Sequence, residues 1–199
     1  MSFKVAHLDE LERIPVMEGL EWRPIRRRFG IWGFGTNAYT AEKPGDWVVE
    51  EHTESSLGHE ELYVVVRGRA TFTLDGDEID APAGTLVFLP DPAVKRRAVA
   101  EEEGTLVLAV GAKPGEAFTP SPWEWYFEAY EQPTEQGIET MQAGIADLGE
   151  RGPLYYHLAC LEARAGRLDD ARDHLAHALE LDPNLNEIAQ KDDDLKEVL

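Results

Sequence analysis

The sequence GDWVVEEHTESSLGHEELYVVVRG spans residues 45–68, and GTLVFLPDPAVK spans residues 84–95. Each stretch begins at a glycine and contains a short run rich in Val, Leu, Tyr or Phe. Short runs of these residues between Gly and Pro are typical of β-strands joined by tight turns. The two stretches therefore predict neighbouring parts of one small β-barrel.

Further short runs on both sides extend this pattern. The candidate strands are residues 31–39, 47–52, 61–66, 70–74, 85–89, 97–100 and 105–110. The dipeptide Asp75-Gly76 is a strong hairpin signal, because both central positions of the favoured turn need a positive φ. Many short strands at close spacing predict an all-β sandwich or barrel.

Polar residues hold fixed spacings within the same two stretches. The first contains Gly45, His52, Glu54, Glu61 and Gly68, and the second contains Gly84, Pro90, Pro92 and Lys95. This pattern resembles the cupin superfamily, whose two motifs are roughly G-x5-H-x-H-x3,4-E-x6-G and G-x5-P-x-G-x2-H-x3-N. The spacings Glu61-x6-Gly68 and Gly84-x5-Pro90 match those motifs. The resemblance implies a mainly β fold, the double-sheet jelly roll also called a double-stranded β-helix.

The sequence departs from the cupin pattern at several ligand positions. His52-Thr53-Glu54 stands where the family has two histidines, and the gap before Glu61 is longer than usual. Pro92 replaces the later glycine, and Lys95 stands where the family has its late histidine. The fold is therefore signalled more strongly than the chemistry, and the catalytic residues are unknown.

Four residues are candidate metal ligands. The resemblance implies ligand status for His52 and Glu61 only, whereas Glu54 replaces a family histidine and shares the strand face of His52 by the two-residue period. His59 shares a face with Glu61 if that strand begins by His59. Imidazole and carboxylate ligands suit Fe, Mn, Ni or Zn.

A cation at the late position argues against a tightly held metal. Lys95 repels a divalent ion and is expected to pair with Glu61 or Glu54, so the expected cofactor is none or a weakly bound divalent metal. Alternatively, Lys95 and Arg97, which share a face if the strand begins by Lys95, hold the carboxylate of an organic ligand. Tyr63 shares the face of Glu61 and should point into the barrel. The candidate ligand-binding residues are thus Tyr63, Lys95 and Arg97.

The second half of the chain has helical periodicity. Three prolines within residues 112–122 indicate a connector, and helices are expected at residues 134–148, from Pro153 to about Ala165, and from Asp169 to just before Pro183. A fourth helix is expected at residues 186–198. The expected organisation is an N-terminal segment at 1–19, a barrel at 20–112, a connector at 113–122 and a helical domain at 123–199.

This helical domain resembles a tetratricopeptide repeat, a helix-turn-helix unit of about 34 residues. With Pro183 at the last consensus position, Ala159 falls in the first helix and Gly166 at the turn, while Ala171 and Ala178 fall along the second helix. These small residues let two helices approach closely. The resemblance implies a surface that binds a partner or a second copy of the chain.

Composition narrows the functional classes. The chain has 199 residues with 39 acidic against 19 basic side chains, a net charge of −20, which disfavours nucleic-acid binding. Its apolar runs are shorter than the ~18 residues of a membrane span, and no secretory signal is evident at the N-terminus. One cysteine, Cys160, fits a reducing compartment. We expect a cytoplasmic protein without membrane contact.

The function expected from the sequence is binding. The barrel would hold a small polar or anionic ligand, and the helical repeat would dock a protein partner or form a homodimer. The alternative is a metal-dependent cupin enzyme of the oxygenase or sugar isomerase type. A second alternative is a non-catalytic structural adaptor.

Overall fold

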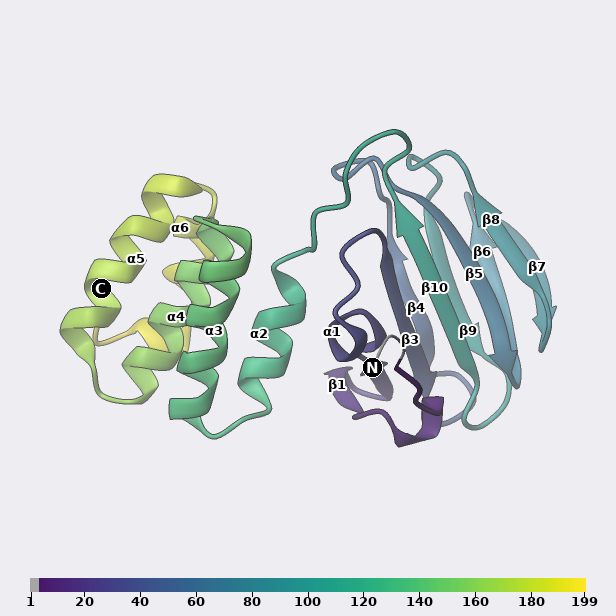
Figure 1. Ribbon diagram of the computed structural model, residues 1–199, viewed down its shortest axis with the longest axis horizontal. Coiled ribbons are helices and arrows are strands. Elements are labelled where there is room, and N and C mark those ends of the chain that lie inside the picture. Colours follow the sequence, from purple (N-terminus) through teal and green to yellow (C-terminus); the bar gives the residue numbers. More distant parts are fainter. Residues whose placement is uncertain (1–3) are drawn as a thin grey trace. The chain divides into compact units, whose positions relative to one another are not determined.

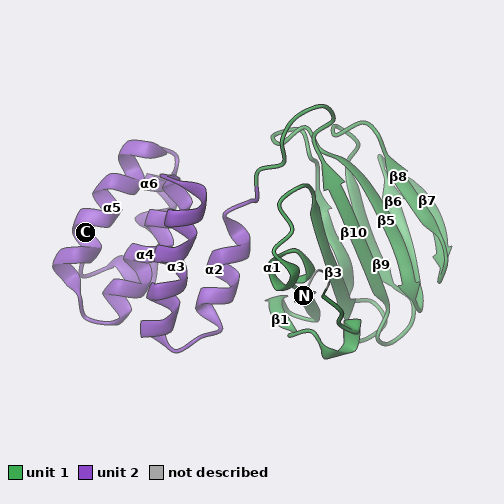
Figure 2. Cartoon of the chain, viewed as in Figure 1, with its two compact units in different colours: residues 1–119 green, residues 120–199 purple. Residues whose placement is uncertain are grey.

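The computed structural model describes residues 4–199, and the chain divides into two compact units. The first unit ends at Thr119 and the second runs from Pro120 to Leu199 (Figure 2). The division lies within the connector expected at residues 113–122.

The first unit is built from two antiparallel sheets (Figure 1). Its strands are β1 (Ile14–Met17), β2 (Leu20–Arg23), β3 (Gly35–Ala41), β4 (Trp47–His52), β5 (Glu60–Arg67), β6 (Arg69–Leu74), β7 (Asp77–Pro82), β8 (Leu86–Leu89), β9 (Arg96–Ala100) and β10 (Leu106–Ala112), with the 3₁₀ turn η1 (Leu8–Glu10) before β1 and the short helix α1 (Ile25–Phe29) after β2. The strand order is β1-β2-β3-β10-β5-β8 in the six-stranded sheet and β4-β9-β6-β7 in the four-stranded sheet. The expected double-sheet β fold is confirmed.

Side chains from both sheets form the core of this unit. Tyr63, Val65 and Val107 come from the larger sheet, and Phe72 and Ala98 come from the smaller one. All five are almost fully buried. Because inward residues recur at every second position, the next inward position before Tyr63 on β5 is Glu61, near the start of the strand.

The hairpin expected at Asp75-Gly76 is confirmed. Asp75 has a φ of 49° and Gly76 a φ of 99°, and together they connect β6 to β7. Strand β7 itself is a difference from the sequence analysis: its sequence DEIDAP is mostly exposed and has little apolar content. Strands β1 and β2 were also not expected, and β1 adds part of the N-terminal segment to the larger sheet.

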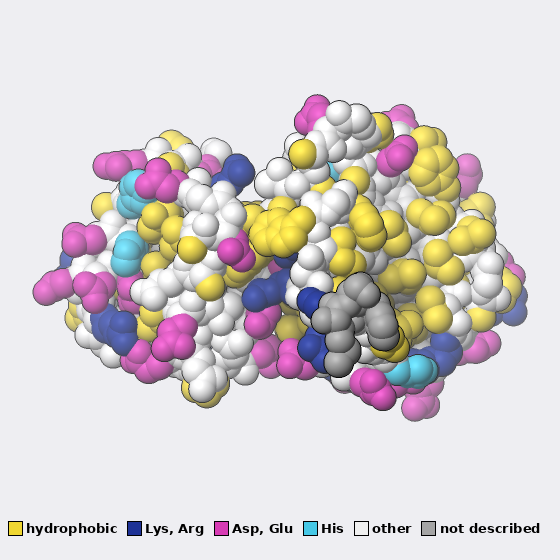
Figure 3. Space-filling view, in the orientation of Figure 1, with side chains coloured by type: hydrophobic (Ala, Val, Ile, Leu, Met, Phe, Trp, Pro, Cys, Tyr) yellow, Lys and Arg dark blue, Asp and Glu magenta, His cyan; other side chains and the backbone are white. Residues whose placement is uncertain are grey.

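The outward face of the larger sheet is apolar over β10, β5 and β8, where hydrophobic side chains gather in Figure 3. Leu86 and Phe88 on β8 are 65% and 55% exposed, and Val66 on β5 is 43% exposed. Strand β8 is an edge strand, so this apolar face continues to the border of the sheet.

The second unit is helical. It contains α2 (Trp123–Tyr130), α3 (Thr134–Leu148), α4 (Gly152–Arg164), α5 (Leu168–Leu181), α6 (Leu185–Ala189) and the 3₁₀ turn η2 (Asp193–Leu195). The hairpin of α4 and α5 buries Ala159, Ala171 and Ala178 completely, as the sequence predicts. Its assignment to the tetratricopeptide class remains a prediction. Within residues 4–199, no helix combines the length and apolar character that a membrane span needs.

Two helical expectations differ from the structure. Helix α2 was not expected, and the helix expected at residues 186–198 is wrong, because α6 ends at Ala189. The Asp192 side chain accepts hydrogen bonds from the backbone N–H of Asp194 (3.0 Å) and from the Tyr156 hydroxyl (2.6 Å). These bonds start a separate 3₁₀ turn instead of continuing the helix.

Candidate functional site

The two polar stretches identified in the sequence meet at one end of the barrel. His52 is the last residue of β4, Glu54 lies in the following turn, and Glu61 is the second residue of β5. The backbone N–H of Glu54 donates to the carbonyl oxygen of Pro92 (2.9 Å), which ties this turn to the loop before β9. Gly58, with a φ of 69°, donates to the Glu54 carbonyl (2.7 Å) and closes the turn.

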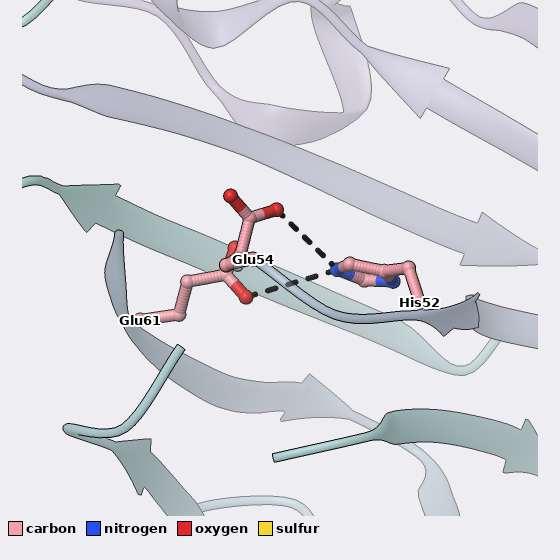
Figure 4. A group of neighbouring side chains, drawn as sticks. All are labelled: His52, Glu54 and Glu61. Atoms are coloured by element: carbon pink, nitrogen blue, oxygen red, sulfur yellow. Dashed lines mark ion pairs between the residues drawn. The ribbon is translucent and has the colours of Figure 1, made fainter. Parts of the chain in front are cut away.

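His52, Glu54 and Glu61 converge in space (Figure 4). The Nε2 atom of His52 lies 3.6 Å from Glu54 Oε1 and 3.8 Å from Glu61 Oε2. One potential ligand atom from each residue lies within 4.8 Å of the others. The His52 Nδ1 N–H donates to the backbone oxygen of Glu50 (2.8 Å), which orients the ring and turns Nε2 toward the carboxylates.

Two further side chains hold Glu61. The Tyr63 hydroxyl donates to Glu61 Oε2 at 2.6 Å, and Arg96 Nη1 lies 3.6 Å from the same oxygen. The Arg96 side chain is completely buried, and Tyr63 is 2% exposed. Glu61 Oε2 therefore faces a hydroxyl donor, a guanidinium and the His52 imidazole. Tyr63 lies inside the barrel, as the sequence predicts.

The two carboxylates of the cluster have opposite pKa shifts. Burial, and then the charge of Glu61, raises the pKa of Glu54 to about 7. Burial also acts to raise the pKa of Glu61, but His52 and the Tyr63 hydroxyl outweigh it, so the pKa of Glu61 falls below its usual range. Near neutral pH, the cluster holds one ionised carboxylate, Glu61, beside one that is partly protonated, Glu54.

The two histidines also differ. Burial acts to lower the pKa of His52, yet contact with Glu61 and the Glu50 carbonyl more than offsets it, so the pKa of His52 is raised. Burial lowers the pKa of His59, and the charge of Glu61 offsets this effect only in part. His59 Nδ1 lies 3.3 Å from Glu54 Oε2, and its ring packs 5.9 Å from that of Phe118. His59 therefore borders the cluster beside Glu54.

All four metal-ligand candidates lie in this region, although the reason differs from the one expected. His52 and Glu54 do not share a strand face, because β4 ends at His52. His59 precedes β5, which begins at Glu60. The Glu54 turn, instead of a regular strand period, brings these side chains together. No sequence period predicts such an arrangement.

The expected pairing of Lys95 with Glu61 or Glu54 is wrong. Lys95 is exposed and pairs with Glu51 at 2.6 Å, and Arg97 Nη1 lies 4.0 Å from the same carboxylate. The side chains of Lys95 and Arg97 thus point away from the interior of the barrel. Their part in ligand binding remains a prediction.

Arg96 is the functional residue that the sequence analysis missed. It is the first residue of β9, and its Cα pairs with that of His52 on β4. The sequence of β9 does indicate that Arg96 points inward. Ala98 and Ala100 are small apolar residues of the inward face, and the two-residue period of a strand places Arg96 on the same face.

The cluster fits a divalent metal by two tests. Its donors are an imidazole nitrogen and two carboxylates, which suit Mn, Fe or Zn. Glu54 Oε2 is buried and accepts no hydrogen bond from the described residues, although His59 Nδ1 lies 3.3 Å away, so this oxygen keeps a lone pair for a further ligand. His52, Glu54 and Glu61 are the residues that would hold the ion.

No protein-family model matches the sequence, and no curated protein matches it. Among solved structures, KdgF from Halomonas sp. is similar at 17% identity and a TM-score of 0.46, over 58% of this chain and 97% of that chain. A sugar phosphate isomerase of the cupin superfamily from Silicibacter pomeroyi is similar at 20% identity and a TM-score of 0.47, over 55% of this chain and 76% of that chain.

A third similar structure is Pac13, described as a unique nucleoside dehydratase, from Streptomyces. It shares 20% identity at a TM-score of 0.42, over 57% of this chain and 84% of that chain. Several of the similar structures are described as cupins. At these identities and TM-scores, the similarities assign neither an activity nor a ligand to this chain.

Proposed function

We propose that this chain is a small-molecule-binding protein whose site is the His52–Glu54–Glu61 cluster, and that the cluster holds a divalent metal weakly. The observation that supports the proposal most strongly is the convergence of one imidazole and two carboxylates within 4.8 Å at partly exposed positions. Partly buried titratable groups with shifted pKa values cluster at functional sites. The ligand class is a small polar or anionic molecule.

The residues of the cluster have separate roles in this proposal. His52 Nε2 and one oxygen from each carboxylate bind the metal, and the Tyr63 hydroxyl fixes the orientation of Glu61. When bound, the metal supplies a positive charge that attracts the oxygen atoms of a polar ligand. His59 and the Phe118 ring border the site and limit the shape of what enters.

Metal titration calorimetry tests this proposal. Manganese and zinc chlorides are titrated into wild-type protein and into His52→Ala, Glu54→Gln and His177→Ala variants. His177 is a histidine on α5 of the helical unit, so its variant controls for adventitious imidazole binding. We expect one weak site that His52→Ala and Glu54→Gln abolish and His177→Ala retains. Identical titration curves for wild type and His52→Ala would reject the site.

An enzyme is the second candidate. The observation that favours it is the contact between groups that can exchange protons: His52 faces Glu54 at 3.6 Å, and the Tyr63 hydroxyl bonds to Glu61. Such a set suits proton transfer at carbon next to a carbonyl, as in sugar isomerisation. Deuterium incorporation into a panel of aldoses and ketoses in D₂O tests this candidate. Exchange that persists in Glu54→Gln, or its absence across the panel, would argue against it.

Association with a partner or a second copy belongs to the same proposal. The supporting observations are the exposed apolar side chains of β5 and β8, such as Leu86 and Phe88, and the α4–α5 hairpin with its close helix contact. A non-catalytic adaptor would use the same surfaces without a barrel ligand. Absence of metal binding in the wild-type protein, together with self-association, would favour the adaptor.

A further inference from the structure

We propose that the Arg96 guanidinium is a built-in cation that occupies the fourth ligand position of the cluster and limits its affinity for divalent metals. The inference rests on the proposed function, because it concerns the same site. Arg96 begins β9 directly opposite His52 on β4. A ligand projecting from this position would complete the set formed by His52, Glu54 and Glu61.

The hydrogen bonding of Arg96 supports this role. Its side chain is completely buried, yet Nε and Nη1 have no hydrogen-bond partner among the described residues. Within residues 4–199, Nη2 alone donates a hydrogen bond, to the Asp91 carbonyl at 3.4 Å. A guanidinium carries five N–H donors, so a buried one with so few acceptors depends on a nearby negative charge. That charge is Glu61, whose Oε2 lies 3.6 Å from Nη1.

The charges of the cluster show what Arg96 does. Glu54 and Glu61 supply up to two negative charges, and Arg96 neutralises one of them within contact distance. A divalent ion bound to Glu61 therefore lies beside a fixed positive charge at short range. Repulsion between charges in a partly buried site is screened little by salt. The guanidinium thus weakens metal binding while it neutralises the charge of Glu61.

The neighbouring residue Arg97 offers a matched control. It carries the same charge one position along β9, but its side chain lies outside and faces Glu51. Removing either arginine makes the same change in net charge. Of these two arginines, Arg96 contacts the cluster and Arg97 does not. An effect of the local charge on metal affinity should therefore appear in the Arg96 variant and not in the Arg97 variant.

The test measures the dissociation constant for Mn²⁺ by calorimetry, with electron paramagnetic resonance of free Mn²⁺ as a second readout. The variants are Arg96→Met, Arg96→Lys, Arg96→His and Arg97→Met, at moderate salt, with His52→Ala as the baseline for non-specific binding. Circular dichroism and thermal melting establish that each variant is folded. Neither readout depends on an enzymatic activity.

We expect Arg96→Met to bind Mn²⁺ at least about tenfold more tightly than wild type, and Arg96→His to bind more tightly still because it adds an imidazole ligand. Arg96→Lys keeps the cation and should bind as weakly as wild type, and Arg97→Met should change affinity by less than about twofold. If Arg96→Met does not fold, the comparison of Arg96→Lys with Arg96→His still tests the inference.

The outcomes separate this inference from the proposed function. If wild type binds Mn²⁺ but Arg96→Met and Arg96→His bind no more tightly, the inference is overturned and the proposed function stands. If wild type binds none while Arg96→His binds at the cluster, the inference stands and the native metal site is rejected. If no variant binds above the His52→Ala baseline, both are overturned.

Discussion

Replacing Tyr63 with Phe removes one hydroxyl from the interior of the barrel. That hydroxyl donates to Glu61 Oε2 at 2.6 Å, and the Tyr63 side chain is 2% exposed. A hydrogen bond to a charged group contributes about 1.5–3 kcal/mol, and water has little access to replace this one. Tyr63→Phe should therefore lower the free energy of unfolding by about 1–3 kcal/mol at neutral pH.

The effect should depend on pH, because the bond acts through ionised Glu61. The folded-state pKa of Glu61 is lowered from its ordinary value of 4.5. Its contribution to stability is therefore present above pH 4.5 and is lost as the pH falls through the folded-state value. The difference between wild type and Tyr63→Phe should shrink in acid over that range.

Urea denaturation of wild type, Tyr63→Phe, Glu61→Gln and the double variant measures the interaction as a double-mutant cycle. We expect a coupling free energy of at least about 1 kcal/mol at neutral pH and a smaller value in acid. A coupling near zero at neutral pH would mean that the hydroxyl and the carboxylate do not interact, and the account of how Glu61 is held would be wrong.

The remaining predictions concern the helical unit and assembly. Burial lowers the pKa of His157 from 6.5 to about 4, so the free energy of unfolding should fall by up to about 3 kcal/mol as the pH drops from 6.5 to 4. If the free energy of unfolding of His157→Gln depends on pH as that of the wild type does, this prediction is wrong. Ala171→Leu should overpack the α4–α5 contact and lower the free energy of unfolding by about 1–3 kcal/mol, whereas Ala176→Leu on the exposed face of α5 should not. If the two variants have the same melting temperature, this packing of α4 against α5 is wrong. Light scattering should give a mass of two or more chains, and a mass near 22.3 kDa would reject self-association.

Local signals predicted much of the fold. Strand β4 and helix α3 have the expected bounds, because turn residues and helical apolar spacing mark their ends. The hairpin at Asp75-Gly76 followed from the positive φ that its turn requires. Strand β7 follows this turn, but its own residues are mostly polar and exposed, so they give no strand signal of their own.

The sequence predicted which residues form the candidate site better than it predicted their arrangement in space. His52 and Glu61 were identified from motif spacing, but the cation beside Glu61 is Arg96 instead of Lys95. Register shifts between Val49 and His52 and between Trp47 and Val49 mark irregular pairing of β4 with β9. Such bulges re-aim side chains at strand ends, so counting residues from a motif can miss the inward position by one.

The central claim is that His52, Glu54 and Glu61 form one metal-binding site at the end of the barrel. Crystals of wild-type protein soaked in manganese chloride test it most directly, with an anomalous difference map measured near the manganese absorption edge. The account predicts an anomalous peak within ligand distance of His52 Nε2 and of both carboxylates. No peak at the cluster, while manganese is bound to acidic side chains elsewhere on the same molecule, would contradict it.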